Sequence, residues 1–393
     1  MTSLQPRRGK LVARGAAVCA AVVAVGSLVV ASIPQVGVRS ADSAARSVQQ
    51  GGTGQSHGQN QASDYFFGGK PDDYGLSLDM KMRRKLLVLR AHRRLNPCGL
   101  VDPVKLVATD PGFQRFGVDG DLSVCSLVFE GDEPSTVTLK ISQNPPTMRE
   151  TARFAIGSVV VSQHAPSEPG TCLYAFDLGI AGLPAAPDRL TDFQAQITAP
   201  EGPGDDPCDR GHAVAATAAA RVATKGAPQW SQTDPVTKVA EADPCLPASR
   251  VPGVVGLSDA DVGTHWCAFM VRPTAKADPV LVKLSVQLRP AQFANQQGEA
   301  WNLTEAQTTE HGDTALMVYS GAFDPATKSY RPSSDKLHCA VYLMVKDPLL
   351  PRAVDASAVD ESETRLPTVE VEGDQAPCSV NRDIATAWAA QLR

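Results

Sequence analysis

The stretch that decides the fold is segment 125–141, CSLVFEGDEPSTVTLKI, in which a cysteine opens an apolar run and a proline precedes three apolar residues at alternate positions. Segment 267–286 repeats this pattern as CAFMVRPTAKADPVLVKLSV. Pro134 and Pro279 stand 145 positions apart, and the alternating residues after each keep the same offset. Alternation with a period of two indicates a half-buried β-strand. The two segments therefore read as copies of one unit.

Cysteines extend the match to both sides of these strands. Asn96-Pro97-Cys98 corresponds to Asp243-Pro244-Cys245 before them, and Pro207-Cys208 corresponds to Pro377-Cys378 after them. Each closing Pro-Cys pair heads an Ala-rich stretch with apolar residues at helical spacing. The lead-ins Glu201-Gly202 and Glu372-Gly373 also agree. Each half of the chain is thus expected to run helix, strands, strands, helix.

Eight cysteines divide into two sets of four, and an even number in an exported chain indicates disulfides. Zinc ligation is the rival, but no two cysteines form a Cys-x-x-Cys pair. Four cysteines allow three connectivities in each half. We expect neighbours to pair, because each such bond would tie the head of a helix to a strand. The expected pairs are Cys98 with Cys125, Cys172 with Cys208, Cys245 with Cys267, and Cys339 with Cys378.

The fold class predicted from these patterns is α+β: an N-terminal transmembrane helix followed by two related domains, each an antiparallel sheet with flanking helices and two disulfides. Segment 289–335 makes the second half longer and could hold a function of its own. The expected organisation is a cytoplasmic tail at 1–14, a transmembrane helix at 15–33, a flexible linker at 34–80, a first repeat domain at 81–225, an interdomain linker at 226–240 and a second repeat domain at 241–393.

Export is predicted from the N-terminus. Four basic residues precede Gly15–Ile33, an uncharged stretch of 19 residues that is long enough for a membrane-spanning helix. The positive flank places the N-terminus in the cytoplasm and the rest of the chain outside the cell membrane. A cleaved secretory signal is the competing interpretation, although such apolar regions are usually shorter. Cys19 opens the apolar stretch and is read as a small membrane-buried residue.

The net charge is −5, and the acidic balance after the N-terminal segment argues against nucleic acid as a partner. One basic run stands out against it. As an exposed surface it would contact anionic lipid headgroups or an anionic wall polymer; otherwise it is a solvated helix face whose leucines pack on the first domain. Its members are Lys81, Arg83, Arg84, Lys85, Arg90, Arg93 and Arg94.

Motifs for catalysis, cofactors and metals are absent from the sequence, and we predict a protein that is not an enzyme and takes no cofactor. There is no Gly-x-Ser-x-Gly, His-Glu-x-x-His or P-loop pattern. Asp119, Asp121, Ser123 and Glu130 match part of a calcium-loop template, but Val124 stands where the template needs glycine. These four residues are therefore interpreted as an ordinary acidic turn.

The Pro-Cys heads, Cys125, Trp266-Cys267 and the two closing helices resemble the extracytoplasmic domains of actinobacterial envelope proteins and lipoproteins of unknown function. More distantly, they are similar to the extracellular sensor domain of mycobacterial serine/threonine kinases. This chain lacks a lipid-accepting cysteine at the end of its apolar segment and lacks a kinase domain. The resemblance implies a compact domain with a ligand groove and supplies no catalytic residues.

The predicted function is that of a single-pass, membrane-anchored extracytoplasmic protein that binds or senses an envelope ligand or protein. A structural or assembly partner of another envelope protein is the alternative, and a secreted hydrolase is a third class.

Overall fold

The computed structural model describes two residues at 66–67 and most of the chain from residue 74 onward. The chain divides into two units, Met1–Gly52 and Thr53–Arg393, and every described residue belongs to the second. The described residues are 66–67, 74–118, 120–130, 135–166, 168–180, 193–202, 208–231, 236–291, 293, 304–309, 312–320, 322–324, 329–331, 338–346, 352–353, 364–374 and 376–393.

The predicted cytoplasmic tail, the predicted membrane helix at 15–33 and Cys19 lie outside the described residues. Within the described ranges, no helix combines the length and the hydropathy of a membrane span.

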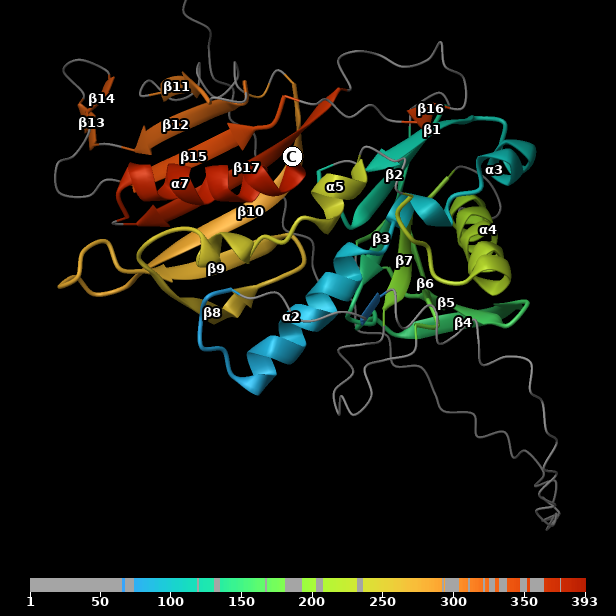
Figure 1. Cartoon of the computed structure of the whole chain (residues 1–393). Helices are drawn as coiled ribbons and strands as arrows, with labels where there is room; N and C mark the ends of the chain where they lie inside the picture. The colour runs from blue at the N-terminus through green and yellow to red at the C-terminus, as the bar shows by residue number, and fades with distance from the viewer. Residues whose placement is uncertain are drawn as a thin grey trace, which may run out of the picture. The chain divides into compact units, whose positions relative to one another are not determined.

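The first sheet has eight strands, and neighbouring strands pair antiparallel. The strands are β1 (Phe113–Val118), β2 (Val124–Phe129), β3 (Ser135–Ser142), β4 (Glu150–Ile156), β5 (Val159–His164), β6 (Thr171–Asp177), β7 (Gln194–Pro200) and β16 (Arg352–Ala353). Their order across the sheet is β16-β1-β2-β3-β7-β6-β5-β4 (Figure 1). The edge strand β16 comes from the distant segment between the last two strands of the second sheet.

The second sheet has seven antiparallel strands in the order β11-β12-β15-β17-β10-β9-β8. They are β8 (Val254–Val262), β9 (Trp266–Val271), β10 (Val280–Pro290), β11 (Thr304–Thr308), β12 (Thr314–Ser320), β15 (His338–Met344) and β17 (Arg365–Asp374). The short strands β13 (Ala322–Asp324) and β14 (Ser329–Arg331) form a separate two-stranded sheet. The segment predicted as an insertion, 289–335, thus carries two regular strands of the sheet, β11 and β12, together with the separate β13–β14 pair.

The strand order is the same in the two sheets once β16 is left aside. The order β1-β2-β3-β7-β6-β5-β4 corresponds position by position to β8-β9-β10-β17-β15-β12-β11. The register agrees as well: Cys125 is opposite Leu139 in the first sheet, and Cys267 is opposite Leu284 in the second. The predicted strands after Pro134 and Pro279 therefore occupy equivalent places.

One part of the predicted correspondence is wrong. Cys172 is opposite Ala199, whereas Cys339 is opposite Gly373. The register therefore matches Gly373 with Ala199 and not with Gly202, which follows the end of β7. The reason is that the connection from the last strand to the closing helix is shorter in the second half.

All four expected disulfides are present. The Cα atoms are 5.1 Å apart in Cys98–Cys125, 5.7 Å in Cys172–Cys208, 5.3 Å in Cys245–Cys267 and 5.4 Å in Cys339–Cys378, all within normal disulfide reach. The second and third cysteines of each half lie near the starts of strands. The other four lie at helix heads, which are the 3-10 turns η1 (Pro97–Leu100) and η3 (Leu246–Ser249) and the closing helices α4 (Asp209–Lys225) and α7 (Cys378–Ala389).

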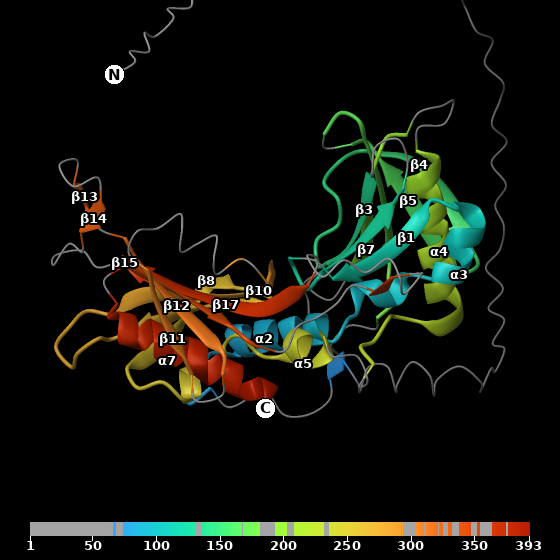
Figure 2. The same ribbon diagram turned by 90° about the horizontal axis from the view of Figure 1, so that it is seen from above.

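Each closing helix packs on its sheet through an apolar stripe. In α4 the buried residues include Val214, Ala218 and Val222, which recur every four positions. In α7, Ile384 and Trp388 are fully buried in the same way. Figure 2 shows α7 lying along one face of the second sheet. Shorter helical elements are α3 (Pro103–Thr109), α5 (Val236–Glu241) and η6 (Ala390–Leu392).

Helix α2 (Met80–Arg93) contributes to both hydrophobic cores. The Asp79 side chain caps it by accepting a hydrogen bond from the Met82 N–H at 2.7 Å. Met82, Leu86 and Leu89 pack in the core of the second sheet, whereas Val88 packs in the core of the first. The prediction that this helix belongs to the first domain alone is therefore wrong, because its apolar residues occupy two sides of the helix rather than one stripe.

Both predicted linkers contain packed residues. Phe66 is fully buried in the core of the first sheet, and Tyr74 is buried in that of the second, so the linker predicted at 34–80 is not flexible throughout. Trp230 is buried in the core of the second sheet, and α5 begins at Val236 within the predicted interdomain linker. Phe66, Tyr74 and Trp230 are packed because a single aromatic residue in a polar stretch of sequence can be anchored in a distant core. Helix α5 is held by Val239 and Ala240, which are buried in the core of the second sheet.

Candidate functional site

The most strongly built polar site in the described part of the chain centres on Asp243, the residue before the Pro-Cys pair of the second half. Its counterpart in the first half is Asn96, whose side chain accepts a hydrogen bond from the Gly99 N–H at 3.1 Å. Asp243 makes a comparable local bond through Oδ1, which accepts from the Cys245 N–H at 2.9 Å. A carboxylate therefore stands where the first half has an amide, and its second oxygen is left for other partners.

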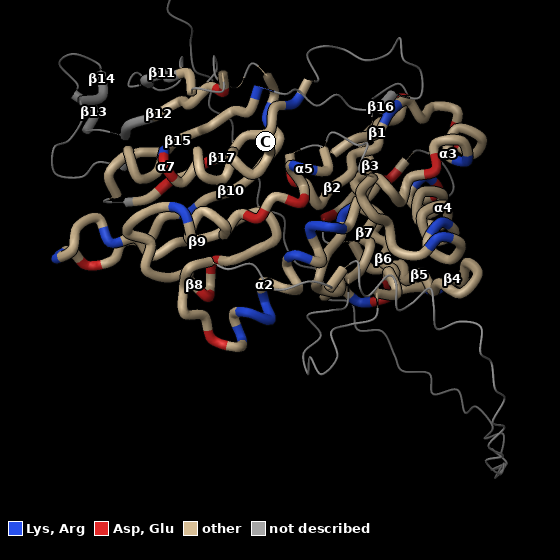
Figure 3. The backbone as a smooth tube through the Cα atoms, in the orientation of Figure 1, with Lys and Arg blue, Asp and Glu red and all other residues tan. Residues whose placement is uncertain are grey.

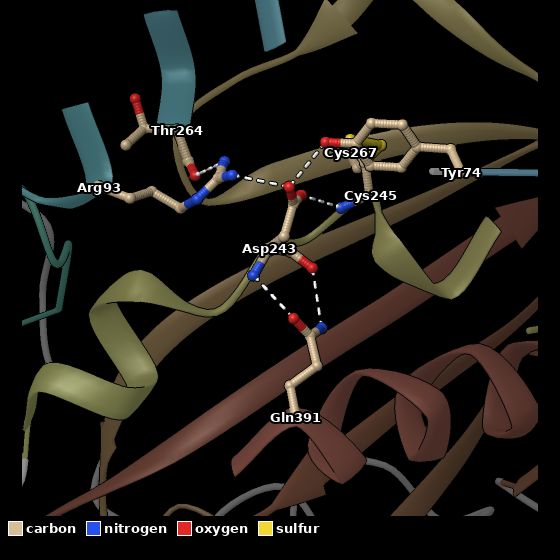
Figure 4. A network of polar contacts seen from close by, with 7 residues as sticks. All are labelled: Tyr74, Arg93, Asp243, Cys245, Thr264, Cys267 and Gln391. Atoms are coloured by element: carbon tan, nitrogen blue, oxygen red, sulfur yellow. Dashed lines mark hydrogen bonds and ion pairs between the residues drawn. A yellow bond between two sulfur atoms is a disulfide. The ribbon is translucent and has the colours of Figure 1, made fainter. Parts of the chain in front are cut away.

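That second oxygen binds two donors from the N-terminal side of the chain. Arg93 at the end of α2 donates from Nη2 to Asp243 Oδ2 at 2.7 Å, and the Tyr74 hydroxyl donates to the same oxygen at 2.7 Å (Figure 4). The Asp243 N–H donates to Gln391 Oε1, and Gln391 Nε2 donates to the Asp243 carbonyl, each at 2.9 Å. Arg93 also donates from Nη1 to the Thr264 carbonyl at 3.3 Å. We call these five residues and Cys245 the Asp243 network.

The ion pair at its centre is removed from water. The side chains of Arg93 and Asp243 are only 2% and 7% exposed. Burying two charges costs several kcal/mol each, and their attraction offsets this only when the remaining donors and acceptors are satisfied. The Tyr74 hydroxyl and the Cys245 N–H supply that satisfaction for the carboxylate. On the other side of the pair, Arg93 Nε is buried and has no hydrogen-bond partner among the described residues. The network therefore favours one particular arrangement of α2, the segment before it and the second half.

A neutral histidine continues the buried polar contacts from α2. His92 Nε2 donates to the Ile141 carbonyl at 3.1 Å, so Nδ1 is the acceptor for the Thr264 hydroxyl at 2.7 Å and the Gln143 amide at 3.3 Å. The Phe193 ring lies 5.3 Å from the imidazole, centroid to centroid. Burial lowers the pKa of His92 from 6.5 to about 4, because a charged imidazolium would lose its hydration.

His265, next to Thr264, is also buried, with 6% of its surface exposed. Burial holds the pKa of His265 well below 6.5, followed by repulsion from His92 once that imidazole is protonated at low pH and from Arg93. Two uncharged imidazoles therefore lie near a buried guanidinium. The partner of the guanidinium is not an imidazole but the Asp243 carboxylate.

The chemistry open to these groups is structural. The Asp243 carboxylate accepts three hydrogen bonds and is paired with Arg93, and both side chains are shielded from solvent. His92 uses its proton on a backbone carbonyl and its lone pair on a hydroxyl. Proton transfer to a substrate needs a group that a substrate can reach, and the members of this network are turned toward one another (Figure 4).

The predicted basic surface is divided by the fold. Figure 3 marks the Lys and Arg positions along α2. Lys81 and Lys85 both bind Asp259, the first through its carboxylate and the second through its carbonyl. The prediction that Arg93 belongs to an exposed basic surface is wrong, because Arg93 is buried and cannot contact an anionic surface. It is buried because it pairs with Asp243, which lies 150 positions away in the sequence. Of the remaining members, Arg83 and Arg84 are exposed, and Arg90 and Arg94 are of intermediate exposure.

The predicted acidic turn is present. Asp121 accepts from the Ser123 N–H at 2.8 Å, and Glu130 accepts from Gln114 at 2.9 Å, while Asp119 lies outside the described residues. Among the residues that the structure describes, no three His, Cys, Asp or Glu side chains gather as metal ligands do.

Sequence reasoning missed Tyr74, Thr264, His265 and Gln391 as a group. The one available signal was Asp243 itself, a charge in a repeated position where the other copy has Asn96. No protein-family model, no characterised protein and no solved structure matches the chain.

Proposed function

We propose that this chain is a membrane-anchored extracytoplasmic protein of the cell envelope, without catalytic activity, that binds or senses an envelope component. The observation that carries the proposal is the set of four disulfides, two in each half at equivalent places. Such bonds persist in oxidising compartments outside the cytoplasm. The basic flank and apolar stretch at 15–33 supply the route of export and the anchor.

The common strand order supports an internal duplication. A duplicated sheet domain provides two copies of the same fold. One copy can then carry different side chains and gain a binding site without a change of fold. The Asp243 network and α2 tie the second half to the segment that leads from the proposed anchor. We infer that the described part of the chain works as one binding module and not as two independent domains.

An assembly role is the second candidate, and one observation favours it. Strand β4 is an edge strand whose residues Glu150–Arg153 and Ala155 are exposed. An exposed edge is a surface to which a strand of another protein can add.

Intact cells treated with a membrane-impermeant amine-reactive cross-linker test the proposal. The full chain should react from outside, at exposed lysines such as Lys81, and should become linked to other envelope material. A chain that reacts only after lysis would refute the extracytoplasmic location. A chain that reacts from outside, links to nothing and also fails to sediment with isolated envelope material would refute binding.

A further inference from the structure

The second sheet buries one of its faces against helix α7. Val282, Leu284 and Val286 of β10 are buried in the same core as Ile384 and Trp388 of α7. Successive residues of a strand point to opposite faces of its sheet. The residues between these three, and those opposite them on the neighbouring strands, therefore belong to the other face.

On that other face, register places four residues side by side across four strands. Trp266 of β9 is opposite Ser285 of β10, Ser285 is opposite Glu370 of β17, and Glu370 is opposite Tyr342 of β15. Neighbouring strands lie about 4.8 Å apart, so the two aromatic residues are separated by about 14 Å. We call these four residues the aromatic row.

Trp266 is an exposed aromatic residue held in a fixed position. It is 50% exposed, although tryptophan is usually well buried. A Cβ atom at Gly263 would overlap the six-membered part of its ring, so the indole lies directly against the glycine backbone. The Gly263 N–H also donates to the Trp266 carbonyl at 2.9 Å. One side of the ring is thus supported while half of the residue stays open to solvent.

The middle of the row consists of fixed polar groups. Arg289 Nη2 lies 3.6 Å from Glu370 Oε2. Burial, followed by the nearby Glu370 carboxylate, raises the pKa of the Tyr342 hydroxyl. The Arg289 guanidinium stacks over the Phe293 ring at 4.9 Å. Opposite charges balance here, so the row offers donors and acceptors without a strong net charge.

The first sheet shows that the fold does not need these side chains. By the same registers, the equivalent row there is Val124, Lys140, Gln196 and Ala175. Neither aromatic residue has a counterpart, and the strand arrangement is the same. The two rings are therefore an addition to the second sheet.

We propose that the aromatic row binds a hydroxyl-rich polysaccharide strand of the envelope, with Trp266 as the stacking platform. Sugar rings present apolar C–H faces that pack on indole and phenol rings, and their hydroxyls pair with carboxylate, guanidinium and serine groups. An extended polymer suits a row of this length, in which Trp266 is the exposed ring and Tyr342, partly buried against Phe293, stands at the far end. The inference rests on the proposed function and names the ligand class for it.

The test is co-sedimentation of the full chain, in detergent, with three insoluble glycans: chitin, cellulose and wall polysaccharide from the producing cell. We expect the chain to bind at least one of them. Trp266→Val, which installs the residue of the first sheet, should weaken that binding about tenfold or more. Val160→Ala, at a 53% exposed position of the first sheet, is the matched control and should bind as the parent does. Equal thermal melting of the variants shows that folding is intact.

Equal binding by Trp266→Val and the parent chain would overturn the inference, and so would a parent chain that sediments with none of the glycans. A variant that loses cross-links to a protein on cells, with glycan binding unchanged, would also overturn it in favour of a protein partner. In each case the proposed function stands if the chain is still cross-linked to envelope material from outside, so the two failures are distinguishable.

Discussion

Replacing Asp243 with alanine should strongly destabilise the protein. The substitution removes the only carboxylate paired with Arg93 in the described part of the chain, together with the acceptor for the Tyr74 hydroxyl and the Cys245 N–H. Arg93 would then remain as a buried charge without its counter-ion. Because α2 packs in both cores, the loss should be felt across both sheets.

The magnitude follows from the burial of the pair. Removing one partner of a buried ion pair costs about 3–5 kcal/mol. Globular proteins have a total stability of about 5–15 kcal/mol, so the variant should lose a large part of it. At about 2–4 °C for each kcal/mol in a chain of this size, the melting temperature should fall by about 10 °C. The double variant Arg93→Met with Asp243→Leu removes both charges and should recover the part of the loss that comes from the unpaired charge. It should not recover the part that comes from the Tyr74 hydroxyl and the Cys245 N–H, which still lack their acceptor.

The assay is thermal unfolding of the full chain without reductant, followed by circular dichroism and tryptophan fluorescence. Lys81→Ala, which removes the exposed ion pair with Asp259, is the matched control and should melt as the parent does. An Asp243→Ala variant that melts with this control would show that the network does not hold the structure together.

Three further predictions concern single sites. His92 has a pKa of about 4 when folded and 6.5 when unfolded, so only the unfolded state takes up its proton between these values. The contribution of His92 to stability should be constant above about pH 6.5 and fall by about 3 kcal/mol on going down to about pH 4, and His265, whose pKa is also lowered by burial, should add to the fall. Urea titrations at each pH measure this, and a pH-independent midpoint would count against it. Replacing Cys172 and Cys208 together by alanine should lower stability by about 3–4 kcal/mol on the chain-entropy model, measured by urea unfolding, with an unchanged midpoint as the contrary result. Gly263→Ala should push the Trp266 ring from its place and reduce glycan sedimentation, and unchanged sedimentation would show that the ring position is unimportant.

Local patterns were sufficient for much of the fold. The alternation after Pro134 and Pro279 identified β3 and β10, and the Pro-Cys pairs identified the heads of α4 and α7. The disulfide pairing could be predicted because each bond joins two successive cysteines of one half, and only three connectivities compete in each half. These features depend on residues that are close in the chain, which is why sequence reasoning could reach them.

Long-range features could not be predicted in the same way. Arg93 looked like one more exposed charge, because nothing near it in the sequence indicates that Asp243 neutralises it. The aromatic row depends on the register of β17. Alignment of the two halves by their cysteines gives the wrong register for this strand, because the connection before α7 is shorter than the one before α4. Strand β16 joins the first sheet from more than 200 positions beyond β1, and its two residues carry no strand pattern.

Peptide mapping by mass spectrometry would decide whether this is an exported protein in which each sheet carries its own two disulfides. The full chain should be purified from its own envelope without reduction and digested under conditions that prevent disulfide exchange. We expect four linkages, Cys98–Cys125, Cys172–Cys208, Cys245–Cys267 and Cys339–Cys378. Free thiols at these positions would contradict the export. A linkage between the two halves would contradict the duplication.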